Sequence, residues 1–73
     1  MTKDELIEEI EDILMLDEGE LDLGAQLVGY EDWDSMSYLS LIALADAKLG
    51  KKLDIETIKS FQTSNDILNF AGL

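Results

Sequence analysis

The tripeptide Asp34-Ser35-Met36 is the place in this sequence where residue types and position indicate chemistry. It stands where a long stretch without helical periodicity gives way to an apolar helical pattern, so Ser35 is expected at the start of a helix. A hydroxyl there is exposed, and the unpaired amides and the positive end of the helix macrodipole favour a phosphate. Ser35 is therefore well placed to carry a phosphodiester. The competing interpretation is that Asp34 and Ser35 only cap the helix.

Histidine and cysteine are both missing from the sequence. Their absence removes the usual bases that activate a nucleophile and the usual transition-metal ligands. We therefore expect no catalytic residue, no metal site and no enzyme activity of the chain's own. The acidic run from Asp17 to Asp22 lacks the ligand spacing of an EF-hand calcium loop, so we expect a solvated acidic loop.

The 73 residues carry a formal charge of −12, from 17 acidic and 5 basic residues. This charge repels nucleic acid and anionic membrane surfaces, so basic protein surfaces are the expected partners. Apolar residues make up 47% of the chain at helical spacing, which predicts one folded domain over 1–73 and not a disordered chain. With no signal-peptide pattern and no apolar stretch approaching about 20 residues, we expect a cytoplasmic monomer without membrane insertion.

The elements that position Ser35 can be predicted from caps and periodicity. Thr2 and Glu5 have the spacing of a capping box, which predicts a first helix running to about Leu16. Its acidic residues are expected on the solvent-exposed face: Asp4, Glu5, Glu8, Glu9, Glu11 and Asp12. Residues 17–33 lose the periodicity and predict a long loop whose leucines lie over the core.

The second half of the chain predicts three more helices. The second runs from Asp34 to about Leu49, with Gly50 as a left-handed C-cap. Its inward face is expected to consist of Met36, Leu39, Ile42, Ala43 and Ala47, widened by Leu41 and Leu44. A short third helix covers 55–60, and Thr63 with Asp66 opens a last one. The predicted fold class is an all-α four-helix bundle with a long loop between helices 1 and 2 and a short third helix.

This helix order, with Asp-Ser and a large apolar residue opening the second helix, resembles the acyl carrier protein family over essentially the whole chain. The family motif is Asp-Ser-Leu, against Asp34-Ser35-Met36 here. The resemblance implies a bundle of acyl-carrier type in which Ser35 carries a covalent 4′-phosphopantetheine arm from coenzyme A. A phosphopantetheinyl transferase (holo-synthase) attaches the arm, whose thiol holds acyl intermediates as thioesters.

Roles for further residues come from the same resemblance. Recognition by the transferase and by acyl-transferring or condensing enzymes with basic docking surfaces is expected of Trp33, Asp34, Met36, Leu39 and Asp46. An acyl cavity is expected among Leu27, Leu39, Ala43, Ile58, Phe61 and Leu68. We expect this cavity as an expandable cleft between the second and third helices, where Ala43 and Ala47 would face Ile58 and Phe61.

Two departures from the family pattern bear on the pathway. Glu31-Asp32-Trp33 precedes the motif where many members have Leu-Gly, and Trp33 is expected either as a buried lid or as an exposed partner contact. The outer face of the second helix is less acidic than in carriers of bulk fatty acid synthesis. Since charge complementarity selects partners, a specialised fatty acid, lipid or polyketide-type pathway is favoured.

Two alternatives are left open by the sequence. One is an unmodified acidic helical protein-interaction module, whose partner-facing patch would consist of Trp33, Met36, Tyr38 and Leu41. The other is an aminoacyl or peptidyl carrier, although the residues before Ser35 do not resemble the Gly-Gly-(His or Asp)-Ser neighbourhood usual in peptidyl carriers. An exposed Ser35 hydroxyl favours a carrier, and a buried one bonded to its own helix favours the module.

Overall fold

The computed structural model describes residues 1–73 as an all-α chain with four α-helices and no strand. The elements in chain order are α1 (Lys3–Ile13), the 3₁₀ turn η1 (Leu27–Gly29), α2 (Ser35–Leu44), its π-helical continuation η2 (Ala45–Leu49), α3 (Ile55–Ser60) and α4 (Ser64–Ala71). The predicted order of long, central, short and final helix is confirmed.

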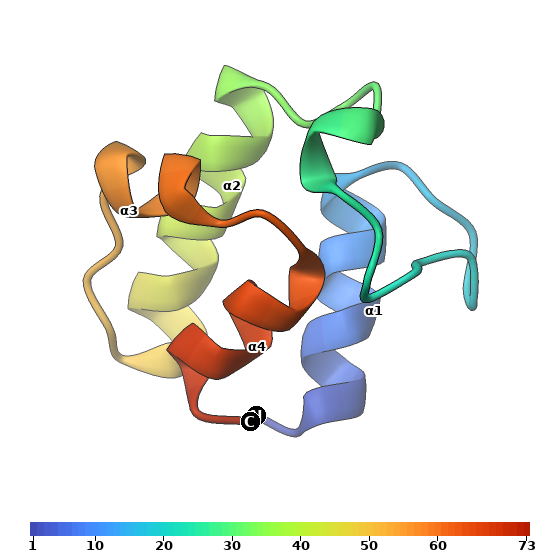
Figure 1. The fold of residues 1–73 in the computed structure, drawn as a ribbon. Helices are drawn as coiled ribbons and strands as arrows, with labels where there is room; N and C mark the ends of the chain where they lie inside the picture. Colours follow the sequence, from blue (N-terminus) through green and yellow to red (C-terminus); the bar gives the residue numbers. More distant parts are fainter.

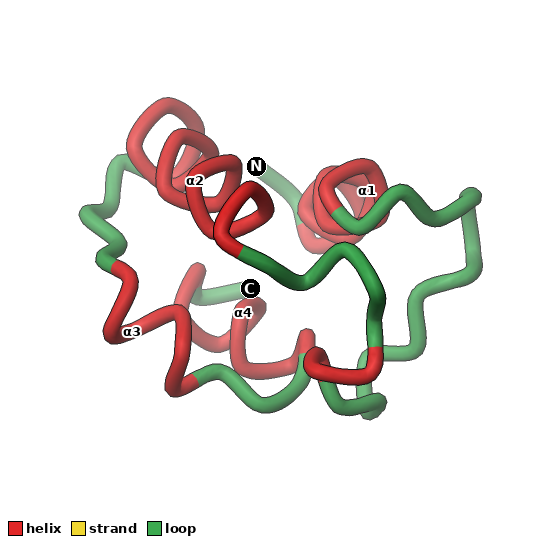
Figure 2. The backbone as a smooth tube through the Cα atoms, turned by 90° about the horizontal axis from the view of Figure 1, so that it is seen from above, coloured by secondary structure: helices red, strands yellow, loops and turns green.

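The helices α1 and α2 lie side by side and run in opposite directions (Figure 1). Seen from above, α3 and α4 lie on the other side of the molecule, with α4 facing both long helices (Figure 2). The end of α1 and the start of α2 lie at the same end of the molecule, while both chain termini lie at the opposite end (Figure 1). The segment between α1 and α2 therefore borders the start of α2.

One hydrophobic core joins the helices to the connecting segments. Its buried members are Leu6, Ile10, Leu14, Leu27, Leu41, Leu44, Ala45, Leu53, Ile58, Phe61, Ile67 and Leu68. Leu27 comes from η1 and Leu53 from the connection between η2 and α3. Both connections are thus anchored by a buried leucine, and burial of such a side chain contributes about 2 kcal/mol.

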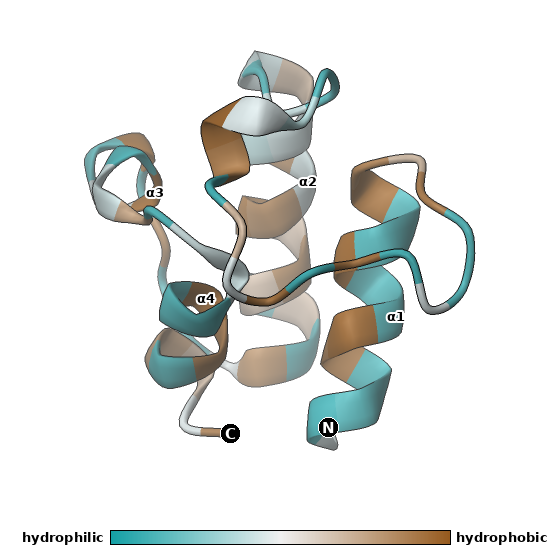
Figure 3. Cartoon of the chain, turned by 45° about the vertical axis from the view of Figure 1, so that its right-hand side comes forward, coloured by the Kyte–Doolittle hydropathy of each residue, from teal (hydrophilic) through white to brown (hydrophobic).

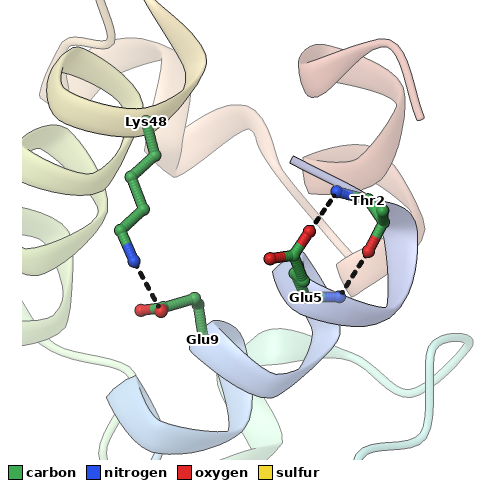
Figure 4. A network of polar contacts seen from close by, with 4 residues as sticks. All are labelled: Thr2, Glu5, Glu9 and Lys48. Carbon is green, nitrogen blue, oxygen red and sulfur yellow. Dashed lines mark hydrogen bonds and ion pairs between the residues drawn. The ribbon is translucent and has the colours of Figure 1, made fainter.

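The capping box predicted at the start of α1 is confirmed (Figure 4). The Thr2 amide donates to Glu5 Oε1 at 2.9 Å, and the Glu5 amide donates to Thr2 Oγ1 at 3.2 Å. A turn further along, Glu9 accepts a 3.0 Å hydrogen bond from Lys48 Nζ, which links α1 to η2 (Figure 4). The ion pair is largely exposed, so we assign it little stability.

The end of α1 was predicted too far along the chain. The helix ends at Ile13, because Leu14 departs from helical geometry and Met15 has a left-handed φ of 58°. A left-handed residue stops the regular run of amide-to-carbonyl hydrogen bonds, and a side chain other than glycine seldom adopts it. Glycine or asparagine usually marks such a helix end, and Met15 is neither.

Glu11 does not lie on the solvent-exposed face of α1, so that prediction is wrong for this residue. Its side chain is only 3% exposed, and Oε2 accepts hydrogen bonds from the amides of Gly19 at 2.8 Å and Leu21 at 3.1 Å. The chain after α1 folds back over this carboxylate. A buried charge is tolerated here because two backbone donors replace its water.

The predicted inward face of α2 is confirmed for Leu41 and Leu44, which are buried, and in part for the half-buried Ile42, but it is wrong for the other four residues. Met36 and Leu39 are 73% and 59% exposed, and Ala43 and Ala47 are exposed as well. The buried residues of α2 and η2 are Ser37, Leu41, Leu44 and Ala45. Apolar residues occupy nearly every side of α2, whereas those of α1 form one stripe (Figure 3). Periodicity alone could not select the buried side.

Gly50 ends the second helical stretch as predicted, with a left-handed φ of 63°. The stretch continues to Leu49, but its last turn widens to π-helical spacing over Ala45–Leu49. The Lys51 amide then donates to the Ala45 carbonyl at 3.1 Å. The prediction of one continuous helix to Leu49 is therefore confirmed in extent, while the wider last turn was not foreseen.

An aspartate near the start of each of α3 and α4 accepts backbone hydrogen bonds: Asp54 is the N-cap of α3, and Asp66 is the third residue of α4. Asp54 Oδ1 accepts from the Thr57 amide at 2.8 Å, which caps α3. Asp66 Oδ2 accepts from the amides of Gln62 at 2.8 Å and Thr63 at 3.2 Å. These backbone donors hold the pKa of each carboxyl below its ordinary value of 3.8.

Because of these caps, we expect the folded state to lose stability in acid. Because the folded-state pKa of Asp66 lies below 3.8, its stabilising effect is fully present above pH 3.8 and is lost as the pH falls through the folded-state pKa. We expect Asp66→Asn to unfold more easily than the wild type at neutral pH, and the difference to vanish in acid. Urea unfolding of both proteins over a pH series measures this, and a difference that stays constant would contradict it.

Ser64, the first residue of α4, is fully buried and its hydroxyl has no hydrogen-bond partner. An unpaired buried hydroxyl destabilises the folded state, so Ser64→Ala should raise the free energy of unfolding by about 1 kcal/mol. Urea unfolding checks the value. Ser60→Ala is the matched control, because the exposed Ser60 hydroxyl donates to the Thr57 carbonyl and its loss should bring no gain. Equal or lower stability of Ser64→Ala would count against the buried, unpaired geometry.

Candidate functional site

The segment that leads into Ser35 is tied to the front of α4. The Leu27 amide donates to the Gln62 carbonyl at 2.8 Å, and Gln26 forms an antiparallel bridge with Thr63. The Leu27 side chain is buried beside these backbone contacts. The segment between α1 and α2 is in this way fixed against one distant part of the chain, the residues just before α4. It therefore delivers Trp33 and Asp34 to a defined position.

The start of α2 is held by a reciprocal pair, Asp34 and Ser37. Asp34 Oδ1 accepts hydrogen bonds from the amides of Met36 at 3.0 Å and Ser37 at 3.2 Å. Ser37 Oγ accepts from the Asp34 amide at 2.9 Å and donates to the Asp34 carbonyl at 2.7 Å. Two amides that we expected to be free for a phosphate are thus satisfied by Asp34. Its carboxylate also offsets the positive end of the helix macrodipole.

Ser35 itself is exposed at the first position of α2, and its hydroxyl makes no hydrogen bond within the chain. The other four serines differ from it. The hydroxyls of Ser37, Ser40 and Ser60 donate to backbone carbonyls, and that of Ser64 is buried. Ser35 is therefore the one serine whose oxygen is both accessible and free of an internal partner.

Trp33 packs partly into the molecule just before the site. Its ring meets Tyr38 edge to face, with ring centroids 5.2 Å apart and an interplanar angle of 73°. Both rings are half-buried against the hydrophobic core. Such an edge-to-face pair adds about 1 kcal/mol to the effect of burial. Trp33 thus packs against α2 just before its first turn, and part of the Trp33 surface stays accessible.

The expected recognition residues fall into two groups along the exposed side of α2. Trp33, Asp34 and Met36 lie around Ser35, whereas Leu39 and Asp46 lie further down the helix. The second group borders an open groove of about 360 Å³ between α2 and the connection to α3. The residues lining it are Leu39, Ile42, Ala43, Asp46, Lys52 and Leu53. The groove begins one helical turn beyond Ser35, about 6 Å along the axis.

The six residues expected to form an acyl cavity are not brought together. Leu27, Ile58, Phe61 and Leu68 are packed in the core, and none of them lines a cavity. Leu39 and Ala43 lie on the surface in the groove. The structure does not place Ala43 and Ala47 opposite Ile58 and Phe61, because α2 is turned to bury Leu41 and Leu44 instead.

Sequence reasoning missed two groove residues, Ile42 and Lys52, as lining of this surface. Lys52 and Leu53 follow Gly50 in a connection without periodicity, so their place against α2 depends on how that connection returns toward α3. The isolated apolar Leu53 next to lysine was the only available signal. Its burial shows that this connection, like the one before α2, is anchored in the core.

The charged residues next to Ser35 in sequence are all acidic. Asp32 and Asp34 precede the serine, and no basic residue occurs between Lys3 and Lys48. No histidine or lysine can therefore remove the proton of the Ser35 hydroxyl from a neighbouring position in sequence. The arrangement suits a serine that another protein modifies, and a cationic surface would be drawn to it.

None of the helices is long and apolar enough to cross a membrane. Comparison of the chain with protein families, with curated proteins and with solved structures gives no match.

Proposed function

We propose that this chain is an acyl carrier protein of the four-helix acyl-carrier type, with a 4′-phosphopantetheine arm attached to Ser35. One observation carries the proposal: Ser35 is the only one of five serines that is exposed and has a hydroxyl without an internal hydrogen bond. It stands at a fixed helix start directly after Asp34. The position and chemistry of this oxygen are those that a phosphodiester linkage requires.

The residues around Ser35 fit such a group. The hydroxyl faces solvent, and a groove of about 360 Å³ with a mostly apolar lining begins one turn further along α2. Leu39 and Ala43 of this groove would contact such a group. When bound, the group supplies a thiol that holds an acyl chain as a thioester.

The chain's own part in loading is to present the Ser35 oxygen. In the loading reaction this oxygen bonds to the phosphorus of the phosphopantetheinyl half of coenzyme A, and adenosine 3′,5′-bisphosphate leaves. The hydroxyl proton goes to a base of the transferase, since no histidine exists in the chain and no lysine lies near Ser35 in sequence. The Asp34 and Ser37 network keeps the first turn of α2 in place for this encounter.

The proposed partners are a phosphopantetheinyl transferase and acyl-transferring or condensing enzymes with basic docking surfaces. The net charge of −12 supports this choice, because opposite charge speeds the encounter of two proteins. The exposed side of α2 presents Met36, Leu39 and Ala43 between its few charges. This mixed surface favours partners of a specialised fatty acid, lipid or polyketide-type pathway.

The patch expected for an unmodified interaction module is less well supported. Of its four expected patch residues, Leu41 is buried and Trp33 and Tyr38 are half-buried, which leaves Met36 alone as a fully exposed contact. An aminoacyl or peptidyl carrier would use the same serine. Such a carrier differs from an acyl carrier only in its cargo. Acylation assays with fatty acids and with amino acids distinguish the two.

Intact mass before and after incubation with a phosphopantetheinyl transferase and coenzyme A tests the proposal. The wild type should gain one phosphopantetheinyl group, and Ser35→Ala should gain none. Ser40→Ala is the matched control, because Ser40 is an exposed serine on the same helix and its loss should leave the gain intact. No gain with several transferases of different specificity would favour the unmodified module.

A further inference from the structure

The five lysines of the chain differ in what their ammonium groups contact. Lys48 Nζ pairs with a carboxylate oxygen of Glu9 at 3.0 Å (Figure 4). Lys51 Nζ donates to the Phe70 carbonyl at 2.8 Å and lies 5.5 Å from the centroid of the Phe70 ring. The other three ammonium groups have no partner within the chain: those of Lys3, Lys52 and Lys59. Three amines are thus free to react, and their surroundings decide which one does.

Of these three lysines, only Lys52 borders a hollow. It lines the groove of about 360 Å³ beside α2, together with Asp46 and four apolar residues: Leu39, Ile42, Ala43 and Leu53. Lys3 and Lys59 are exposed and line none of the hollows of the molecule. Asp46 shares the groove with Lys52, but the two side chains form no ion pair. An unpaired amine therefore stands beside an apolar surface at this one place.

The groove offers apolar surface that the fold leaves uncovered. Leu39 is 59% exposed, whereas Leu53 is 8% exposed and belongs to the core. Each methylene of a saturated chain that is buried there strengthens its binding about fourfold. The charge of −12 repels an anionic ligand such as a free fatty acid, so a neutral ligand is favoured. An acyl thioester of a small neutral thiol combines a saturated chain with a carbonyl that an amine can attack.

We propose that Lys52 is a site of N-acylation, at which a medium-chain acyl thioester bound in the groove transfers its acyl group to the lysine nitrogen. The unprotonated Nζ attacks the thioester carbonyl, a C–N bond forms and the C–S bond breaks. The sulfur leaves with the electron pair of that bond and takes up the proton that the nitrogen loses, so an amide and a free thiol result. Binding of the chain holds the carbonyl near the amine and so speeds the transfer. The step needs no modification of Ser35.

The test uses the unmodified chain and the octanoyl thioester of N-acetylcysteamine, which is neutral. Intact mass gives the rate of acylation, and tandem mass spectrometry of peptides cleaved at acidic residues gives its position. Lys52 should gain the octanoyl group about fivefold faster than Lys59, or more, because Lys59 is an exposed lysine without a groove. With the acetyl thioester, whose chain buries almost nothing, the two rates should be alike. Equal octanoylation of Lys52 and Lys59, no octanoylation of Lys52, or the same preference with acetyl would overturn the proposal.

Variants separate chain binding in the groove from a general reactivity of Lys52. Leu39→Gln should remove most of the preference for Lys52, because a polar side chain replaces apolar lining. Val28→Gln, at an exposed apolar residue outside the groove, should keep the preference. Ala43→Gln, also in the groove, is the second variant if Leu39→Gln loses its helical circular dichroism. A preference for Lys52 that survives both groove substitutions would refute the site, whatever the loading of Ser35 shows.

Discussion

Leu27→Ala is expected to lower the free energy of unfolding by about 3 kcal/mol. The Leu27 side chain is fully buried and belongs to the same core as the helices, although it comes from the connection between α1 and α2. Its truncation removes apolar contacts and leaves a cavity that the surrounding helices cannot fill. The loss should appear in urea unfolding monitored by circular dichroism.

The neighbouring residue provides the control. Val28 is 81% exposed, so Val28→Ala should change the free energy of unfolding by less than about 0.5 kcal/mol. Both substitutions shorten an aliphatic side chain to alanine at adjacent residues of η1, so their position in the chain is matched. Similar losses for the two variants would mean that η1 is not anchored in the core. The place of Trp33 and Asp34 before Ser35 would then need another explanation.

Glu11→Ala is expected to cost about 2 kcal/mol, because two backbone amides lose a charged acceptor. Glu11 Oε2 accepts from the amides of Gly19 and Leu21 at 2.8 and 3.1 Å, and these contacts fold the chain back after α1. Removing the carboxylate should also increase hydrogen exchange of these two amides. Exchange measured by NMR therefore gives a local readout beside the global stability.

Glu8→Ala is the matched variant for this experiment. Glu8 lies on the same helix, is exposed and accepts no hydrogen bond, so its loss should have little effect or should relieve repulsion among the acidic residues. If Glu8→Ala and Glu11→Ala have equal stability and unchanged exchange at Gly19, the buried carboxylate does not hold the loop.

Helix starts were predictable because side chains close in sequence determine them. Thr2 with Glu5, Asp54 and Asp66 each accept backbone hydrogen bonds where the spacing of cap residues indicates. The position of Ser35 at the first turn of α2 follows from the same local rule. The competing interpretation, that Asp34 caps the helix, is confirmed, since Asp34 accepts from two of the amides that a phosphate would have found.

Features that depend on contacts between distant segments were not predictable. Glu11 has the spacing of an exposed residue, and only the return of Gly19 and Leu21 over α1 makes it buried. The apolar residues of α2 surround the helix, so its rotation is decided by how α1 and α4 pack against it. This rotation places Leu39 and Ala43 outside, and the groove there depends on a connection without periodicity.

Three contacts fix the position of Ser35, although the residues directly before it form no helix. Leu27 anchors the connection in the core, Trp33 packs on Tyr38, and Asp34 joins Ser37 at the helix start. Leu27, Trp33 and Asp34 all lie within eight residues of Ser35 in sequence, although the core that holds Leu27 comes from distant segments. A serine held in this way keeps its backbone rigid while its oxygen stays accessible, as a carrier visited by several enzymes requires.

The most direct test of the assignment to Ser35 is to locate the added group in the sequence. After incubation with transferase and coenzyme A, the chain is digested and the peptides that contain Ser35, Ser37 and Ser40 are sequenced by tandem mass spectrometry. The account predicts one phosphopantetheinyl group on Ser35, whose hydroxyl has no internal partner, and none on the hydrogen-bonded Ser37 or Ser40. A group on Ser40 or Ser64, or an unmodified Ser35 in a chain that has gained mass, would contradict it.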